Sequence, residues 1–328
     1  MGLNWVKDNI NQFGGDPNRV TLMGSRGGAV LGEILLYCKK AMNLFNGVIL
    51  QSGTALETVF FNKSPRSKAF QLAEKLNITV NNSQDLLREL QKIDFATIYS
   101  KLSEIVVDSE EDEDFFYFSP IIENEYPDAI ITSLPENAEI INDVPVMIGM
   151  NSREGLDLIR EYLNRPTLID DVANDFRFLF PIRTDYKLDF ESDIYKNATQ
   201  EIINFYFKEG YVYYGNVLDY AVYIGDILQN YALNLAARQF SQKLNSSVFF
   251  YMFDFKGQLN ENMASIEKIM RFSVGQWGAT NTDELCYLHL CSRIKNIYKE
   301  LLNLVSEQPE TKVLKKMVRL WTNFAKTG

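Results

Sequence analysis

Apolar residues in the first fifty positions follow helical spacing in some stretches and form short continuous runs in others. Over residues 3–13 they recur every three or four positions, which predicts an amphipathic helix. Gly14-Gly15-Asp16-Pro17 ends that helix, because glycine supplies a left-handed cap and proline cannot continue a helix. The elements predicted next are a strand over 20–23, a helix over 29–40 and a strand over 48–51.

The remaining chain repeats this alternation on a larger scale. Buried strands are predicted over 145–150 and 248–253, and the intervening segment 155–245 is mostly helical and rich in aromatics. Other helices are predicted within 64–106, 292–304 and 311–326, the last packing through Trp321 and Phe324. Helices alternating with strands favour an α/β fold with a mainly parallel sheet. No repeat or linker is visible, so residues 1–328 are interpreted as a single domain.

Composition narrows the class of protein. The 328 residues carry 33 basic and 43 acidic side chains, so the chain is net acidic and nucleic acid is not an expected partner. The 13% of aromatic residues argue against disorder. No apolar run reaches the roughly 18 residues of a membrane span. The acidic run 108–114 is interpreted as a solvated loop, with a docking site for a basic partner as the alternative.

Histidine and cysteine are scarce. The only histidine is His289, so a metal site with several histidines is excluded, and we predict neither a metal nor a cofactor. Cys38, Cys286 and Cys291 allow at most one internal disulfide and leave one thiol over. Buried apolar packing is the simpler interpretation of Cys286 and Cys291, and catalytic thiols are the alternative.

A glycine-rich turn between the predicted strand 20–23 and helix 29–40 is the main candidate for chemistry. Gly24, Arg26 and Gly28 fit the Gly-x-nucleophile-x-Gly spacing of a nucleophile elbow. Such a turn is too tight for side chains at its glycines, and it holds the central residue so that its side chain projects into the site. Arg26 occupies the position at which a serine is expected.

Longer motifs around this turn resemble the carboxylesterase type-B family, which contains the cholinesterases and carboxylesterases. Within that family, the sequence of these motifs is most similar to the insect esterase branch. The resemblance implies an α/β-hydrolase fold with a mainly parallel central sheet flanked by helices. It covers the chain from end to end and is carried by residues 5–10, 13–22, 48–55, 145–155, 278–285 and 320–328.

Carried over residue by residue, the family's catalytic set is incomplete in this chain. The acid falls on Glu154, the nucleophile on Arg26, the general base on Asn281 and an oxyanion-hole amide on Gly27. Ser25 stands where the family usually has a supporting glutamate. The family's other oxyanion donors would precede Met1, so we expect a chain that lacks the first strands of the sheet and is cut at both ends.

The substitutions remove the chemistry of ester hydrolysis. Arg26 has no nucleophilic lone pair near neutral pH, and the amide of Asn281 cannot accept and return a proton. Loss of triad members lowers turnover by about 10⁶-fold, so we predict that this chain is inactive as an esterase. Arg26 is instead hypothesised to pair with Glu154. Ser25 as nucleophile and His289 as a displaced base are weaker alternatives.

Three functions stay open. In the first, the chain is a family member with a degenerate triad and serves as a non-catalytic binding or adhesion protein with a protein partner. In the second, it is an active hydrolase of small esters whose sequence is partial or wrong at positions 26 and 281. In the third, it is a product without a biochemical role. The family implies a secreted or extracellular protein, although residues 1–20 show no signal peptide. Sequons for N-glycosylation begin at Asn62, Asn77, Asn81, Asn197 and Asn245.

Overall fold

The strands of the computed structural model form one parallel sheet. The structure describes residues 1–61, 65–102, 118–183, 189–271, 275, 278–303 and 308–328. Its strands are β1 (Thr21–Ser25), β2 (Gly47–Gln51), β3 (Val146–Asn151) and β4 (Val248–Phe253). They lie in the order β1-β2-β3-β4, and each pairs in parallel with its neighbour. The predicted α/β class with a parallel sheet is confirmed.

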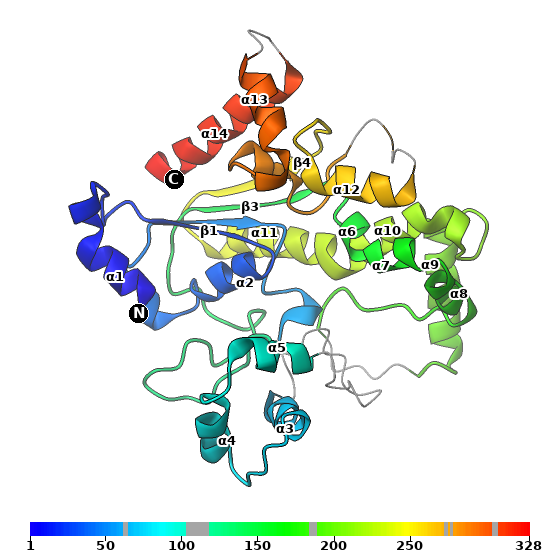
Figure 1. Cartoon of the computed structure of the whole chain (residues 1–328), viewed down its shortest axis with the longest axis horizontal. Helices are drawn as coiled ribbons and strands as arrows, with labels where there is room; N and C mark the ends of the chain where they lie inside the picture. Colours follow the sequence, from blue (N-terminus) through cyan, green and yellow to red (C-terminus); the bar gives the residue numbers. More distant parts are fainter. Residues whose placement is uncertain (62–64, 103–117, 184–188, 272–274, 276–277, 304–307) are drawn as a thin grey trace. The chain divides into compact units, whose positions relative to one another are not determined.

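Side chains on alternate positions of the strands enter different apolar clusters, as the period of a strand requires. Leu50 and Ile148 pack with residues of α2 (Gly27–Ile34) and α11 (Tyr231–Lys243). Ile49 packs with Trp321 and Phe324, both buried in α14 (Pro309–Thr327), as predicted for these two aromatics. Helices therefore cover both faces of the sheet (Figure 1).

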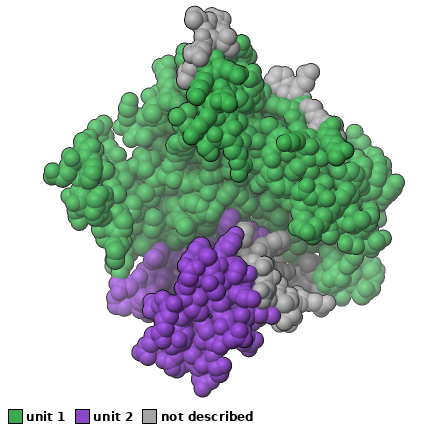
Figure 2. All heavy atoms as spheres, viewed as in Figure 1, with its two compact units in different colours: residues 1–57, 135–328 green, residues 58–134 purple. Residues whose placement is uncertain are grey.

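Two compact units make up the chain, residues 1–57 with 135–328, and residues 58–134 (Figure 2). The further helices of the first unit are α1 (Gly2–Asn9), η1 (Ile10–Phe13), η2 (Lys39–Ala41), α6 (Gly155–Leu158), α7 (Arg160–Asn164), α8 (Thr167–Asn174), α9 (Asp193–Tyr206), η4 (Tyr214–Asn216), α10 (Val217–Gly225), the π-helical turn η5 (Asp226–Asn230), α12 (Glu261–Met270), η6 (Asp283–Tyr287), η7 (Ser292–Ile294) and α13 (Lys295–Asn303). Apolar residues of α6 to α10 and α12 form a separate core cluster.

The second unit is helical. It contains η3 (Thr58–Phe60), α3 (Pro65–Lys75), α4 (Ser83–Leu90) and α5 (Phe95–Leu102), where the sequence predicted helices within 64–106. Asn82 caps α4, since its side chain accepts a hydrogen bond of 2.9 Å from the backbone N–H of Asp85. The acidic run 108–114 and the sequon at Asn62 lie outside the described residues.

Two predicted elements differ from the structure. The helix predicted over 29–40 ends at Ile34, because tighter turn bonds follow, such as Leu36 N–H to the Glu33 carbonyl at 2.8 Å. The strand predicted over 248–253 exists as β4, but its burial was predicted wrongly. Phe249, Phe250 and Met252 are exposed. β4 is the last strand of the described sheet, so no further strand shields its outer edge.

In the part of the chain that the structure describes, none of the helices combines the length and apolar character needed to cross a bilayer.

Candidate functional site

The turn after β1 has the backbone conformation of a nucleophile elbow. Arg26 lies between β1 and α2 with φ 52° and ψ −121°, a region that non-glycine residues seldom occupy. Gly24 is required there, because a Cβ on it would lie 2.2 Å from the Gly28 carbonyl oxygen. A Cβ on Gly28 would meet nothing within 4 Å, so the expectation that both glycines are sterically required was wrong for Gly28.

Arg26 pairs with a carboxylate that the sequence did not single out. Its guanidinium lies 3.5 Å from Oε2 of Glu57 and donates to the backbone carbonyl of Ser52 at 3.4 Å. The Glu57 side chain is 1% exposed and that of Arg26 25%. Burial raises the pKa of Glu57 to about 8, and the charge of Arg26 opposes that rise. The ion pair seen for Arg26 is therefore to Glu57, whereas the hypothesis named Glu154.

Glu154 follows β3 and is held by several donors. Its Oε1 accepts hydrogen bonds from the Ser52 hydroxyl at 2.5 Å and from the backbone N–H of Asn151 at 2.8 Å. The carboxylate is 1% exposed. An oxygen acceptor of this kind, buried and fixed by several donors, is suited to orient a neighbouring donor group.

Asn281 provides that neighbouring donor. Its side-chain Nδ2 donates to Oε2 of Glu154 at 3.2 Å. The backbone carbonyl of Asn281 accepts a hydrogen bond from the side-chain amide of Asn262 at 2.8 Å. Asn281 is 6% exposed. The structure thus brings into direct contact Glu154 and Asn281, the residues on which the resemblance places the acid and the general base.

These groups gather at one edge of the sheet. Arg26, Ser52 and Glu154 follow the carboxyl ends of β1, β2 and β3 respectively. Because the three strands are parallel and adjacent, their carboxyl ends lie at the same edge. This is where ligands and reacting groups are found in open α/β sheets.

Sequence reasoning missed a second layer of polar contacts. Nδ2 of Asn151 donates to Glu284 at 2.6 Å, and Nε2 of Gln51 donates to the same carboxyl group at 3.1 Å. Burial raises the pKa of Glu284 to about 8, and the nearby carboxylate of Glu154 adds to the rise. Gln51, Asn151 and Glu284 all lie within the motifs that carry the resemblance, and that was the available signal.

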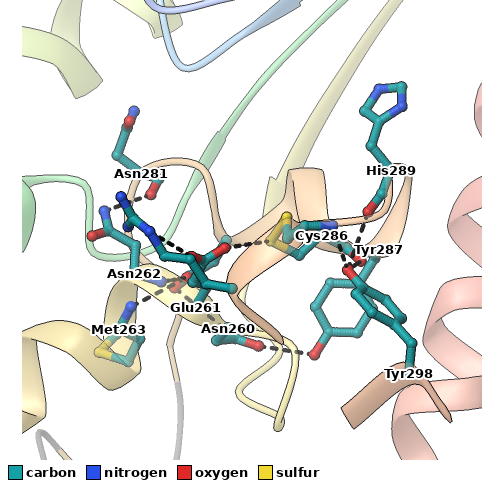
Figure 3. Close-up of a disulfide and its surroundings, with 12 residues drawn as sticks. Asn260, Glu261, Asn262, Met263, Asn281, Cys286, Tyr287, His289 and Tyr298 are labelled. Atoms are coloured by element: carbon teal, nitrogen blue, oxygen red, sulfur yellow. Dashed lines mark hydrogen bonds and ion pairs between the residues drawn. A yellow bond between two sulfur atoms is a disulfide. The ribbon is translucent and has the colours of Figure 1, made fainter. Parts of the chain in front are cut away.

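The weaker candidates have other surroundings. Within the described residues the Ser25 hydroxyl is buried without a hydrogen-bond partner, so no base is bonded to it. His289 is exposed, and Asn281 and His289 lie on opposite sides of the nearby disulfide (Figure 3). Gly27 is the first residue of α2, directly after Arg26.

The cysteines form the single disulfide that their number allowed. Cys286 is bonded to Cys291, and Cys38 is a buried free thiol. Both sulfur atoms lie near the carboxylate of Glu261, the arrangement closest to a metal-ligand cluster within the described ranges. Sulfurs bonded to each other are not thiolates, so they do not serve as metal ligands.

Comparison with known proteins gives a consistent result. The sequence model of the carboxylesterase family matches residues 1–328. Esterase E4 of Myzus persicae is 25% identical over 327 residues, which are 99% of this chain and 56% of that protein. Neuroligin-2 of Rattus norvegicus is 28% identical over 178 residues, which are 54% of this chain and 20% of that protein. The chain thus spans little more than half of that esterase.

The fold has a close counterpart among solved structures. The juvenile hormone esterase from Manduca sexta, solved with OTFP covalently attached, superposes with a TM-score of 0.72 at 20% sequence identity. The match covers 99% of this chain and 59% of that one. The parallel sheet flanked by helices is therefore an α/β-hydrolase fold.

Proposed function

Since this chain belongs to the carboxylesterase family, we propose that it is a family member whose serine-hydrolase site has degenerated into a fixed, non-catalytic arrangement. One observation carries the proposal. The elbow turn is formed, but it presents Arg26, and the acid Glu154 is bonded to the amide of Asn281. The expected serine and histidine positions are thus both filled by groups that cannot perform their chemistry.

Ester hydrolysis depends on a nucleophilic lone pair and on the transfer of a proton. Acyl transfer needs an oxygen nucleophile and a base that removes its proton. The guanidinium of Arg26 has N–H donors and no lone pair that could attack a carbonyl, and it lies 3.5 Å from Oε2 of Glu57. The amide of Asn281 donates a hydrogen bond to Glu154 but does not titrate in the useful range. Turnover about 10⁶-fold below that of an intact triad is expected.

A binding or adhesion function is the second candidate. The match to Neuroligin-2 over half of this chain favours it, because that relative, unlike Esterase E4, is not named as an esterase. In this function a protein partner replaces the ester substrate. An active hydrolase of small carboxylic esters is the remaining candidate, supported by the likeness to Esterase E4 and by the presence of Glu154.

We also propose a secretory route for the protein, which would make it an extracellular glycoprotein. The Cys286–Cys291 disulfide supports this route, since disulfides persist in oxidising compartments. Four sequons in the described residues, at Asn77, Asn81, Asn197 and Asn245, agree with it, because all four asparagines are exposed.

A serine-reactive fluorophosphonate probe tests the loss of catalysis. The full-length product is first established by sequencing its transcript across codons 26 and 281. We expect no labelling of the native protein under conditions that label an active esterase completely. Labelling of the native chain at any serine, mapped by peptide mass spectrometry, would contradict the proposal. A serine codon at 26 together with a histidine codon at 281 would restore the ordinary hydrolase instead.

A further inference from the structure

The C-terminus of α3 is closed by a motif that ordinarily uses glycine. The backbone N–H of Ile78 donates to the Ala73 carbonyl at 2.8 Å, and that of Asn77 donates to the Glu74 carbonyl at 3.0 Å. This pair of bonds defines a Schellman motif in which the residue after the cap is left-handed. That residue is Asn77, with φ 58°. Asparagine is the side chain that tolerates this conformation best after glycine.

Asn77 also begins the sequon Asn77-Ile78-Thr79. Asn77 and Thr79 are both exposed, and the chain from residue 76 to residue 80 is outside any helix or strand. In the described part of the chain the Asn77 side-chain amide makes no hydrogen bond. Its nitrogen can therefore carry a large polar substituent without breaking a contact of the fold.

Residues of two other sequons make hydrogen bonds within the fold. The amide nitrogen of Asn245 donates to the Asp143 carboxylate at 2.8 Å. Asn197 lies inside helix α9, and the hydroxyl of its sequon residue Thr199 donates to the Tyr195 carbonyl at 2.9 Å. The amide of Asn81 is exposed as well, but its sequon continues into α4, where Asn82 is the N-cap and Ser83 the first helical residue. Among the described sequons, Asn77 therefore combines an exposed, unbonded amide with three residues that all lie outside helices.

The disulfide is an independent observation about the compartment. Cys286 and Cys291 are bonded in a loop whose backbone converges on the hydroxyl of Tyr298, which donates to the Cys286 carbonyl at 2.6 Å and accepts from the Cys291 N–H at 3.2 Å (Figure 3). An oxidising compartment is required for such a bond to persist. In eukaryotic cells the same compartment attaches oligosaccharides to sequons.

We propose that Asn77 carries an N-linked oligosaccharide. The donor is a lipid-diphosphate-linked oligosaccharide. The Asn77 amide nitrogen forms a bond to the anomeric carbon of the first sugar, the bond from that carbon to the diphosphate oxygen breaks, and the lipid diphosphate leaves. The amide gives up one proton to a base of the transferase. This inference rests on the secretory route proposed above.

The test expresses the full chain behind an added cleavable signal sequence, so that entry into the pathway does not depend on the native protein's own route. Peptides are deglycosylated with an amidase in ¹⁸O water, which marks each occupied asparagine as labelled aspartate. Trypsin cuts after Lys75 and Arg88, so one peptide reports Asn77 and Asn81 together, and fragmentation separates them.

The matched variants are Asn77→Gln, Thr79→Val and Thr79→Ser. We expect label at position 77 in the native sequence and in Thr79→Ser, which keeps the sequon, and its complete loss in the other two. Each loss should also increase electrophoretic mobility by one glycan. An unlabelled Asn77 in a secreted chain that is labelled at another sequon would overturn the inference and leave the secretory route standing. Cytosolic retention of the native full-length product would overturn the route itself.

Discussion

The side chains of Asn281 and Glu154 are joined by a hydrogen bond of 3.2 Å from Nδ2 to Oε2, inside a site where both residues are buried. In the function proposed above, this amide takes the general-base position, where the acid would orient an imidazole. The bond fixes geometry but moves no proton. This contact is the one expected under the proposed function, in which the site keeps a fixed geometry without the groups that react.

Removing this contact should lower stability. Asn281→Ala leaves one oxygen of a buried carboxylate without its donor, and we expect the free energy of unfolding to fall by about 1–3 kcal/mol. Asn281→Asp should lower it further, because two carboxylates would then face each other in a buried site. Urea unfolding measures both. Asn234→Ala is the control, since its amide is exposed and donates to the Asn230 carbonyl. Equal stability of Asn281→Ala and the native protein would contradict this account.

Arg26 and Glu57 should behave as a coupled pair. Arg26→Met removes the charge that opposes the rise in the pKa of Glu57. We expect Arg26→Met and Glu57→Gln each to destabilise the fold, and the double variant to be more stable than the sum of the single losses predicts. The coupling energy should be about 0.5–3 kcal/mol. Arg26→Lys keeps the charge and serves as the control. Additive losses in the cycle would mean that the ion pair contributes nothing.

The sequence was informative where a local pattern determines geometry. The spacing of Gly24 and Arg26 predicted the elbow, and a Cβ on Gly24 indeed collides with the turn. Gly14 has the left-handed φ of 79° that the end of the first helix required. The resemblance placed Glu154 and Asn281 in one site, although 127 positions separate them, and the structure joins them by a hydrogen bond.

Contacts between substituted or distant residues were not predictable in this way. Glu57 lies 31 positions from Arg26 and resembles an ordinary surface glutamate in the sequence, since only the folded ends of β1 and β2 bring the two together. Gln51 and Glu284 are 233 positions apart, and no spacing rule links them. The disulfide was one of the three pairings that three cysteines permit, and burial of the β4 aromatics depended on neighbours that a sequence pattern does not specify.

Stability should fall as pH rises toward 8. Burial raises the pKa of Asp283 to about 7 and that of Glu284 to about 8. In the unfolded chain both return to values near 4. Between about pH 4 and pH 8 the native protein therefore binds more protons than the unfolded chain, so its stability decreases with increasing pH. The contribution is complete below pH 4 and lost above pH 8. Urea midpoints across this range measure it.

Glu284→Gln is the matched variant for that pH dependence. It keeps the shape of the side chain but cannot ionise, so the decline in stability should be shallower than in the native protein. Asp143 supplies the opposite control. Although desolvation works against it, hydrogen bonds from Asn245 and Ser246 lower its pKa to about 2, and its contribution is lost only below pH 4. A native profile that rises from pH 5 to pH 8 would show that Asp283 and Glu284 do not carry these shifts.

The disulfide should stabilise the fold and keep Cys286 and Cys291 from reacting as thiols. Cys286→Ser combined with Cys291→Ser is expected to lower the free energy of unfolding by roughly 2 kcal/mol, because a cross-link over a separation of five residues restricts the unfolded chain only modestly. Reductant should destabilise the native protein by a similar amount and leave the double variant unchanged. Thiol titration in denaturant without reductant should detect Cys38 alone. Detection of all three thiols under those conditions would mean that the bond does not form in the native protein.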